Sequence, residues 1–502
     1  MIEIEKWALA AMLALFYSVI CWFLFRRRGA ATITSDIVVA YASQSGRAHL
    51  LATKTAEAFT GAASLCALNQ LSAEDVCGIR TLYVVASTYG EGEPPDNGAA
   101  FSSVVQQLQP NALSALEFAI LGLGDSHYPE FCAFAKSLYG TLHARGATPL
   151  CTLLEMDAAN PRLEQQVLTQ WQRQLQAGDG VFSFKAADQL VHPTRQRAAI
   201  CERRLLNPGS PGAPMYFLSL SVNQGAVSYQ AGDIIEIFPK NNASSYESIL
   251  AQLEIGGESL TDTQGGKRTA TEIAATRDLY RVSLPSLNNK TDNLKWLNNL
   301  PELAPRQYSI ASAGNNKSLE IVVRQHIADN GTLGVASGFL TEHTSLGDEL
   351  EFCIKQNIEF HSPDADKPLI LIGNGSGIAG LRAHLKHRAC SGGAPCWLLY
   401  GERDPQADRP FAGELTEWLA CGVLEQLDCV FSRDPTHPEY VQDRMRANAD
   451  LLEHWLQRDA CILVCGSRLG MGEGVHSVLE DILGLKTVAR MQAEGRYRRD
   501  VY

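Results

Sequence analysis

One long apolar run opens the chain. Residues 7–25 read WALAAMLALFYSVICWFLF and contain no charge. A helix of this length spans about 28 Å, which is close to the thickness of the hydrocarbon core of a membrane. Trp7 and Trp22 lie near its ends, where aromatic side chains gather at membrane interfaces, and arginines occupy positions 26–28. By the positive-inside rule we expect a retained single-pass anchor, with all later domains on the cytoplasmic side of a plasma (inner) membrane.

Two other interpretations of this run are a cleaved signal peptide and a buried core helix. A signal peptide carries its basic residues before the apolar run and a small-residue cleavage site after it. Here the basic residues follow the run, and no A-x-A-like site comes behind it. The pattern therefore favours the anchor, and the first predicted segment is residues 1–34.

Beyond the arginines, short apolar runs replace the long one. In two regions they alternate with helical patterns, which is typical of a parallel sheet in an α/β domain. The runs are residues 36–41, 82–86 and 118–123 in the first region, and residues 368–373, 397–400, 427–431 and 460–465 in the second. Between these regions, residues 215–222, 232–238 and 319–324 form strand-like runs separated by turn residues, which predicts a small antiparallel β-barrel.

Composition narrows the class of protein. A chain of 502 residues suggests about three domains, and 45% hydrophobic residues exclude wholesale disorder. The 55 acidic residues exceed the 43 basic ones, giving a net charge of −12, and no long basic run favours a nucleic-acid partner. The 13 cysteines are an odd number without C-x-x-C spacing, so we expect reduced thiols and no metal site.

Small polar residues follow each strand of the first α/β region. The loop of residues 43–48 leads from a strand into a helix, where backbone N–H groups and hydroxyls can hold a monophosphate. The next two strands run into loops that carry Tyr89 and Tyr128, which could sandwich a flat ring at the carboxyl edge of the sheet. Each loop alone would also fit an ordinary strand–helix turn.

Taken together, S-Q-S-G, S-T-Y-G-E-G-E-P-P-D-N and L-G-D-S-x-Y closely resemble the FMN-binding loops of flavodoxin-like domains in diflavin reductases. The resemblance implies that the first loop holds the FMN phosphate, that the two tyrosines flank the isoalloxazine, and that Asp157 lies near the flavin edge. The FMN residues that it implies are Ser43, Gln44, Ser45, Gly46, Arg47, Ala48, Ser87, Thr88, Tyr89, Gly90, Gly92, Leu123, Gly124, Asp125, Tyr128, Phe131, Cys132 and Asp157.

Two motifs in the barrel region carry further chemistry. An arginine can neutralise a pyrophosphate, and an aromatic residue two positions later on the same strand face can pack on a flavin. The pair R-x-Y-S and G-V-A-S-x-F-L resembles the FAD-binding motifs of ferredoxin-NADP reductase-like domains. The FAD residues implied are Arg306, Gln307, Tyr308, Ser309, Gly334, Val335, Ala336 and Ser337.

The last region contains G-x-G-x-x-G between a strand and a helix, where a pyrophosphate can bind. The series G-S-G-I-A, Y-G-x-R, S-R-D, Y-V-Q and C-G-S resembles an NADP-binding reductase domain, with Pro438 where the family usually has Lys and Gly380 where it has Pro. The nucleotide residues implied are Gly375, Ser376, Gly377, Ser432, Arg433, Tyr440 and Gln442. The resemblance further places Ser309, Cys465 and Asp500 at the hydride-transfer site and Tyr502 on the FAD ring.

We therefore expect a multidomain α/β protein in this order: anchor 1–34, flavodoxin-like doubly wound FMN domain 35–175, linker 176–193, FAD-binding barrel 194–362 and NADP-binding α/β domain 363–502. The stretch 242–305 predicts a shortened connecting subdomain inside the barrel region. The ending R-Y-x-R-D-V-Y is similar to that of sulfite reductase flavoprotein subunits.

The resemblance implies a membrane-anchored, NADPH-dependent diflavin reductase. Electrons would pass from NADPH through FAD and FMN to a one-electron acceptor, most simply a heme protein. The alternatives are the flavoprotein component of an assimilatory sulfite reductase and a reductase of ferric chelates or quinones. A flavin-binding scaffold without turnover is disfavoured by the intact hydride-site residues.

Overall fold

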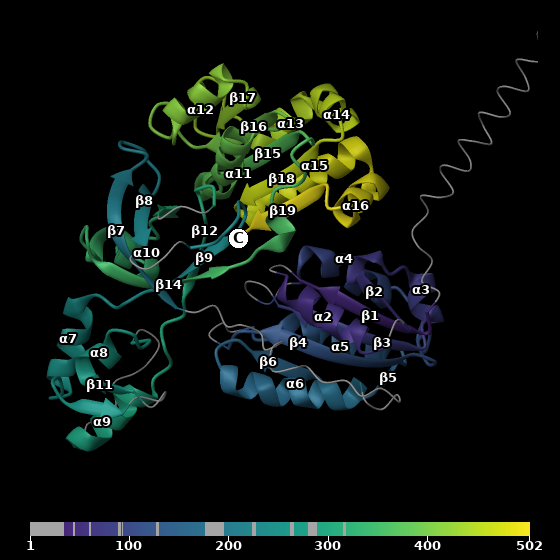
Figure 1. Ribbon diagram of the computed structural model, residues 1–502, viewed down its shortest axis with the longest axis horizontal. Coiled ribbons are helices and arrows are strands. Elements are labelled where there is room, and N and C mark those ends of the chain that lie inside the picture. Colours follow the sequence, from purple (N-terminus) through teal and green to yellow (C-terminus); the bar gives the residue numbers. More distant parts are fainter. Residues whose placement is uncertain are drawn as a thin grey trace, which may run out of the picture. The chain divides into compact units, whose positions relative to one another are not determined.

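The computed structural model describes residues 35–43, 46–59, 62–88, 92, 94–126, 130–175, 195–222, 227–261, 266–279, 289–314 and 318–502 (Figure 1). The predicted anchor and the predicted linker lie outside these residues. Within the described part of the chain, no helix is both long enough and apolar enough to cross a membrane. The described residues divide into two compact units: the first contains most of residues 35–175, and the second contains residues 195–502 together with residues 46–47, 125–126 and 130–131.

The first unit is built on a six-stranded parallel sheet of order β2-β1-β3-β4-β5, with β6 paired to β4. Its strands are β1 (Ile37–Ala42), β2 (Ala63–Ala67), β3 (Thr81–Ser87), β4 (Glu117–Gly124), β5 (Thr148–Pro149) and β6 (Leu154–Asp157). Its helices are α2 (Arg47–Glu57), α3 (Ala73–Gly78), α4 (Asp96–Gln106), α5 (Ala133–Ala144) and α6 (Pro161–Leu175), with a 3-10 turn η1 (Leu68–Gln70). The strand order reverses between β1 and β3, so a crevice opens there at the carboxyl ends of the strands.

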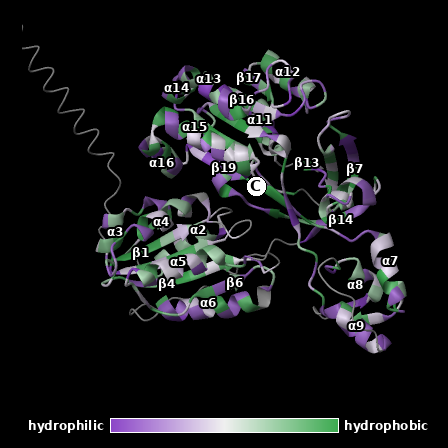
Figure 2. Ribbon diagram, turned by 180° about the vertical axis from the view of Figure 1, so that it is seen from behind, coloured by the Kyte–Doolittle hydropathy of each residue, from purple (hydrophilic) through white to green (hydrophobic). Residues whose placement is uncertain are grey.

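Burial explains why these segments became strands and helices. Every residue of β3 and β4 except those at the strand ends is buried, as expected for parallel strands covered on both faces. Figure 2 shows hydrophobic residues concentrated on strands such as β1 and β4. A Cβ at Gly122 would lie 2.7 Å from that of Ala135, so helix α5 can approach β4 only over a glycine.

The second unit begins with an antiparallel sheet of order β12-β9-β14-β7-β8-β13. The strands are β7 (Gln196–Leu205), β8 (Met215–Val222), β9 (Ile234–Phe238), β12 (Arg306–Ser309), β13 (Ser318–Arg324) and β14 (Glu349–Lys355). A bridge between Ile310 and Ile321 joins the two edges and closes the predicted barrel. Helix α10 (Val335–Gly338) and the π-helical turn η3 (Phe339–His343) place Phe339 and Leu340 in the barrel core.

A small helical insert separates β9 from β12 in sequence. It contains α7 (Ala243–Gln252), α8 (Ala270–Ala274) and α9 (Lys290–Asn299), with a hairpin of β10 (Ser259–Thr261) and β11 (Lys267–Thr269). Leu250, Leu253, Ile273 and Leu297 form a hydrophobic cluster of its own. The insert therefore has an independent, though small, core.

The end of the second unit is a five-stranded parallel sheet of order β17-β16-β15-β18-β19. The strands are β15 (Leu369–Asn374), β16 (Cys396–Glu402), β17 (Leu424–Phe431), β18 (Cys461–Gly466) and β19 (Tyr497–Val501). The helices and turns are η4 (Ile358–Phe360), η5 (Gly375–Gly377), α11 (Ile378–Ser391), α12 (Ala412–Ala420), α13 (Val441–Ala447), α14 (Ala449–Gln457), η6 (Arg468–Gly472), α15 (Glu473–Leu483) and α16 (Leu485–Ala493). Alternate strand residues pack on α11 and α12 on one face and on α13 to α16 on the other.

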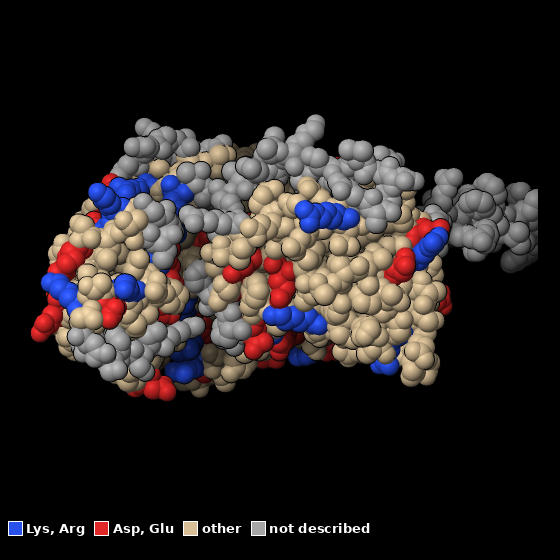
Figure 3. All heavy atoms as spheres, turned by 90° about the horizontal axis from the view of Figure 1, so that it is seen from below, with Lys and Arg blue, Asp and Glu red and all other residues tan. Residues whose placement is uncertain are grey.

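A buried arginine joins this sheet domain to the barrel. Arg382, on α11, is 3% exposed and donates to the carbonyl of Ala311 at 2.8 Å and to Glu320 at 2.5 Å. Its other nitrogens donate to Glu414 on α12 at 2.9 Å. At the surface, by contrast, acidic and basic side chains are interspersed on the face shown in Figure 3.

Candidate active site

Three side chains from separate strands of the second unit meet at its centre. The Ser309 hydroxyl, at the end of β12, donates to Asp500 Oδ2 on β19 at 2.8 Å. The Cys465 thiol, on β18, donates to the same oxygen at 3.7 Å. All three residues are buried, with at most 8% of any of them exposed. The structure thus brings together the three residues predicted for the hydride site, although Ser309 and Asp500 lie 191 positions apart in the chain.

Burial sets the charge of this cluster. Burial raises the pKa of Asp500, and the hydrogen bonds from Ser309 and Cys465 offset only part of that rise. Burial also raises the pKa of Cys465 well above its ordinary value, and the neighbouring Asp500 carboxylate raises it further. The sulfur is therefore held as a neutral thiol whose proton faces Asp500.

Gly380 forms one wall of the cluster. A Cβ at this position would lie 3.1 Å from Cys465 Sγ and 3.5 Å from the Cβ of Ser309 and from a ring carbon of Phe360. The first distance is shorter than a relaxed contact between these atoms, so a side chain at residue 380 would press on the thiol.

The glycine loop η5 lies directly against the end of β18. A Cβ at Gly377 would come within 2.1 Å of the Cys465 carbonyl oxygen, and one at Gly373 within 2.3 Å. Gly375 has φ +57°, and its carbonyl accepts a hydrogen bond from the Tyr400 hydroxyl at 2.7 Å. Gly377, predicted for pyrophosphate binding, is thus also required by close backbone packing, and Gly375 is favoured by its positive φ angle.

The C-terminal residue also reaches this loop. The Tyr502 N–H donates to the Gly466 carbonyl at 3.0 Å, and the Tyr502 hydroxyl lies 3.1 Å from Ser376 Oγ. Figure 1 shows the C-terminus beside β19 and β12. The residue predicted to cover the FAD ring therefore lies directly after β19, the strand that carries Asp500.

The residues predicted for the 2′-phosphate lie at the end of β17. The Ser432 and Arg433 N–H groups donate to the carbonyls of Glu402 and Arg403, each at 2.9 Å, so the two loops run side by side. The side chains of Arg433 and Tyr440 are exposed. Gln442 packs against Gly474, and its buried Oε1 has no partner among the described residues. The exposed guanidinium of Arg433, at the carboxyl end of β17, can bind a dianionic phosphate.

Sequence reasoning missed the part that Glu402 plays in this loop. Its carboxylate is buried and accepts from Arg324 at 2.6 Å and from the Tyr400 hydroxyl at 3.0 Å. Burial raises the pKa of Glu402, and Arg324 counteracts that effect. The Glu402 carboxylate is therefore paired with Arg324 of the barrel and does not take the place of the acidic residue that binds the ribose in NAD sites. The only sequence signal was an acidic residue at the end of the second strand of the domain.

The residues predicted for FAD lie along one edge of the barrel. Arg306, Gln307 and Tyr308 pair with β9, and the Arg306 guanidinium donates to the carbonyls of Ala304 and Pro305, both at 3.1 Å. Gly334 precedes α10, which contains Val335, Ala336 and Ser337. The Ser337 hydroxyl accepts from the His326 N–H at 3.1 Å, which holds the start of α10 against the end of β13.

In the first unit, the crevice between β1 and β3 contains two buried hydroxyls without partners among the described residues. They are Ser43 Oγ, after β1, and Thr88 Oγ1, after β3. The Ser43 N–H donates to Asn97 Oδ1 at 2.8 Å, which fixes the end of β1. Buried hydroxyls normally have a partner, so these two fit a bound FMN that accepts their hydrogen bonds.

The structure also describes eleven other residues predicted for FMN. The described ones are Gly46, Arg47, Ala48, Ser87, Gly92, Leu123, Gly124, Asp125, Phe131, Cys132 and Asp157. Gly46 and Gly92 have positive φ angles, as tight loops require, and Asp157 accepts from the Ala159 N–H at 3.0 Å. Gln44, Ser45, Tyr89, Gly90 and Tyr128 lie outside the described residues, so the predicted aromatic sandwich is untested.

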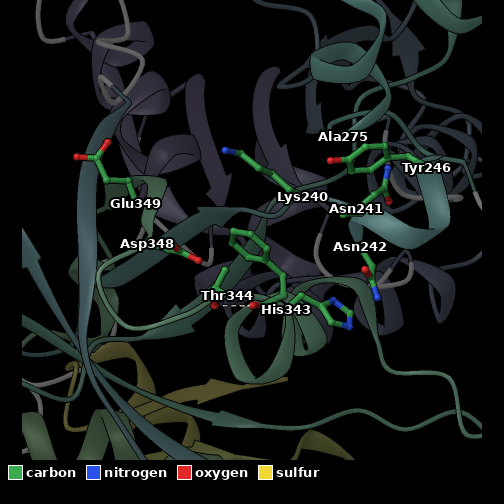
Figure 4. A pocket seen from close by; sticks show the side chains of 11 residues that line it. Lys240, Asn241, Asn242, Tyr246, Ala275, His343, Thr344, Asp348 and Glu349 are labelled. Carbon is green, nitrogen blue, oxygen red and sulfur yellow. Dashed lines mark hydrogen bonds between the residues drawn. The ribbon is translucent and has the colours of Figure 1, made fainter. Parts of the chain in front are cut away.

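A separate hollow of about 370 Å³ lies between the end of β9, the start of α7 and the end of η3 (Figure 4). Lys240 and His343 line it together with Asp348 and Glu349, and the amine of Lys240 points away from Asn241 and Tyr246. None of the residues predicted for flavin or nucleotide binding lines this hollow. It is therefore distinct from the hydride-site cluster, and the polar Lys-Asn-Asn segment after β9 was its only sequence signal.

Both α/β domains match known protein families. Residues 39–171 match the flavodoxin family, and residues 371–477 match the oxidoreductase NAD-binding domain family. The chain is 28% identical to the sulfite reductase NADPH flavoprotein alpha-component of Photobacterium profundum, over 94% of this chain and 90% of the relative. The same component of Vibrio cholerae is 28% identical over 94% and 88%, and that of Bacillus subtilis 26% identical over 94% and 90%.

These alignments are longer than the chain itself. They run over 545, 544 and 545 positions, against 502 residues here, so the relatives have residues at positions where this chain has none. A connecting subdomain shorter than that of the relatives would account for part of the difference. The predicted fold order of a flavodoxin-like domain followed by a reductase module is confirmed, as are the predicted cofactors. The chain is a flavin-dependent oxidoreductase that uses FMN, FAD and NADPH, and it is similar to diflavin reductases over nearly its whole length.

Proposed function

We propose that this protein is the flavoprotein component of a sulfite reductase-like system and delivers electrons from NADPH to a separate heme-containing component. The observation that carries the proposal is the buried Ser309–Cys465–Asp500 cluster beside the glycine loop and the terminal Tyr502. The relatives are sulfite reductase flavoprotein components, which supports this function over that of a general heme-protein reductase. When bound, the two flavins supply the chemistry that converts a two-electron hydride donor into single-electron delivery.

In this proposal the chain's own residues position the reactants. Asp500 orients the Ser309 hydroxyl and the Cys465 thiol, so that both face the space in which nicotinamide meets the flavin. Their burial excludes water from the reacting atoms, which strengthens each polar contact there. Arg433 and Ser432 select the 2′-phosphate, and the hydroxyls of Ser43 and Thr88 hold FMN. The remaining residues predicted from the sequence bind FMN, FAD or the nucleotide in this proposal.

We further propose that residues 7–25 anchor the protein in the plasma (inner) membrane, with the catalytic domains in the cytoplasm. The uncharged run followed by three arginines supports this orientation. The same run supports a second candidate function, the reduction of a membrane heme protein, quinone or ferric chelate, because an anchor would keep the flavins close to an acceptor in the membrane.

The acceptor can be identified with the protein lacking residues 1–28. NADPH oxidation is followed with the hemoprotein component of a sulfite reductase plus sulfite, and separately with cytochrome c, a ferric chelate and a quinone. We expect sulfite-dependent NADPH oxidation only with the hemoprotein component. Turnover with quinone or ferric chelate but none with the hemoprotein would favour the second candidate, and no turnover with any acceptor would reject both.

The anchor is tested in cells. Deleting residues 1–28 should move the protein from the membrane fraction to the supernatant without loss of FMN or FAD. A reporter fused after Tyr502 should be active on the cytoplasmic side. A reporter active only outside the membrane would contradict the proposed orientation.

A further inference from the structure

The hydrogen bond between Ser376 and Tyr502 connects two parts of the site that sequence reasoning treated separately. Ser376 lies in the glycine loop, where the coenzyme pyrophosphate is expected. Tyr502 is the residue expected to cover the FAD ring. Their hydroxyl oxygens lie 3.1 Å apart, although the residues are 126 positions apart in the chain. A group that binds one of them can therefore influence the other.

The main chain of Tyr502 is held firmly, whereas its side chain is not buried. Its N–H donates to the Gly466 carbonyl, and its carbonyl accepts from the Arg468 N–H, both at 3.0 Å. The preceding residue, Val501, is 3% exposed, but Tyr502 is 52% exposed. Movement at this end of the chain is thus confined to rotation of the tyrosine side chain.

The direction of the side chain follows from the strand. Residues two apart along a strand point to the same side, and the Tyr502 N–H continues the hydrogen-bonding ladder of β19 beyond Val501. Asp500 points into the hydride-site cluster. Tyr502 therefore lies on the side of β19 that nicotinamide must approach.

Ser376, in contrast, is a fixed anchor point. Gly377 on one side packs against the Cys465 carbonyl, and the carbonyl of Gly375 on the other side accepts from Tyr400 at 2.7 Å. The loop cannot follow a moving tyrosine without breaking these contacts. Displacement of the Tyr502 ring must therefore break its hydrogen bond to Ser376.

We propose that Ser376 is a positioning residue that holds Tyr502 over the flavin until the coenzyme pyrophosphate takes its place. This inference rests on the proposed function, because it assumes that nicotinamide and pyrophosphate bind where that proposal puts them. A phosphate oxygen accepts the Ser376 hydroxyl proton in a charge-assisted hydrogen bond, which is stronger than one between two neutral hydroxyls. The Tyr502 hydroxyl is then released to water, and its ring can rotate away. Pyrophosphate binding and opening of the flavin face are in this way coupled, without any covalent step.

A double-mutant cycle on the flavin-loaded enzyme tests the coupling. Tyr502→Phe keeps the ring but removes its hydroxyl. Ser376→Ala removes the hydroxyl that holds Tyr502, which is also the predicted contact to the coenzyme phosphate. The ligands are NADP⁺, 2′-phospho-ADP-ribose, which has the pyrophosphate but no nicotinamide, and 2′-AMP, which has neither. Dissociation constants come from calorimetry, and the flavin absorbance band reports the ring position.

We expect Tyr502→Phe to strengthen binding of NADP⁺ and 2′-phospho-ADP-ribose by about 2- to 10-fold, the value of one neutral hydrogen bond. Binding of 2′-AMP should not change. In the Ser376→Ala background, Tyr502→Phe should have no effect on any ligand. In the wild type, 2′-phospho-ADP-ribose should shift the flavin band, whereas 2′-AMP should leave it unchanged.

Thr416→Ala is the control, because this exposed hydroxyl on α12 lies outside the predicted site and donates to the Ala412 carbonyl at 2.8 Å. It should leave all three dissociation constants at the wild-type value. Equal binding of 2′-phospho-ADP-ribose by the wild type and Tyr502→Phe would overturn the inference while leaving the proposed function intact. Failure of NADP⁺ to bind the wild type at all would instead reject the proposed function.

Discussion

The surroundings of Asp500 change its pKa. Burial raises its pKa, so the folded protein holds the Asp500 proton more tightly than the unfolded chain does. The resulting stabilisation is complete below the unfolded pKa, about 3.9, and is lost as the pH rises through the raised value. The same carboxyl accepts hydrogen bonds from Ser309 and Cys465 and so fixes their orientation, although burial disfavours its charged form.

Asp500→Asn should therefore change the pH dependence of stability in a defined direction. Asparagine does not titrate, but its oxygen can still accept from Ser309. The free energy of unfolding of the wild type minus that of the variant should fall as the pH rises from about 4 towards 7. Denaturant titrations at several pH values measure this difference. A difference that stays constant over this range would contradict the raised pKa.

Arg433 governs the choice of coenzyme at the same scale. Loss of a charge-assisted phosphate contact costs about 1.5–3 kcal/mol. Arg433→Ala should raise the Michaelis constant for NADPH about tenfold or more and leave that for NADH almost unchanged. The control is Arg446→Ala, because Arg446 is exposed and pairs with Asp443 and Asp481. Equal losses with both coenzymes would show that Arg433 is structural.

At the scale of elements, the glycine loop depends on backbone contact with β18. Gly377→Ala would put a Cβ 2.1 Å from the Cys465 carbonyl oxygen, so the loop must shift away from the strand. We expect a destabilisation of about 1–3 kcal/mol and loss of NADP⁺ binding. Gly413→Ala in α12 is the control, since nothing lies within 4 Å of the added carbon. If Gly377→Ala binds NADP⁺ normally, the loop does not have to stay against β18.

At the scale of the whole molecule, Arg382 holds the barrel and the nucleotide domain together. It is buried and shared by Glu320 and Glu414, and breaking a buried ion pair costs about 3–5 kcal/mol. Arg382→Met should therefore lower the unfolding temperature of the second unit and weaken FAD retention. The first unit has its own core, so its unfolding temperature and its FMN content should not change. Scanning calorimetry with flavin release separates the two units.

Arg458→Met is the comparison for this experiment, because the pair of Arg458 with Glu425 is exposed at 2.8 Å and should be worth less than about 1 kcal/mol. A fall in both unfolding transitions of Arg382→Met would mean that the two units unfold together. An effect no larger than that of Arg458→Met would mean that Arg382 does not stabilise the interface.

The sequence by itself determined the strands, the order of the domains and the cofactor motifs. These depend on local patterns, namely apolar runs of strand length and loops of small polar residues at their ends. The predicted run at 215–222 coincides with β8, and the helix predicted to follow the loop of residues 43–48 begins within that loop, at Arg47. Motif spacing also identified Ser309, Cys465 and Asp500, but only through the resemblance to a family.

Only the tertiary structure decided which of these residues touch. The pairing of Arg324 with Glu402, the network around Arg382 and the bond from Ser376 to Tyr502 each join segments that are at least 32 positions apart. No local pattern encodes such contacts, because they depend on how the barrel and the sheet domain pack and on the register of β18 with β19. The glycines are the intermediate case. The sequence shows where they are, and for Gly373 and Gly377 the contact with the Cys465 carbonyl shows why a larger residue cannot replace them.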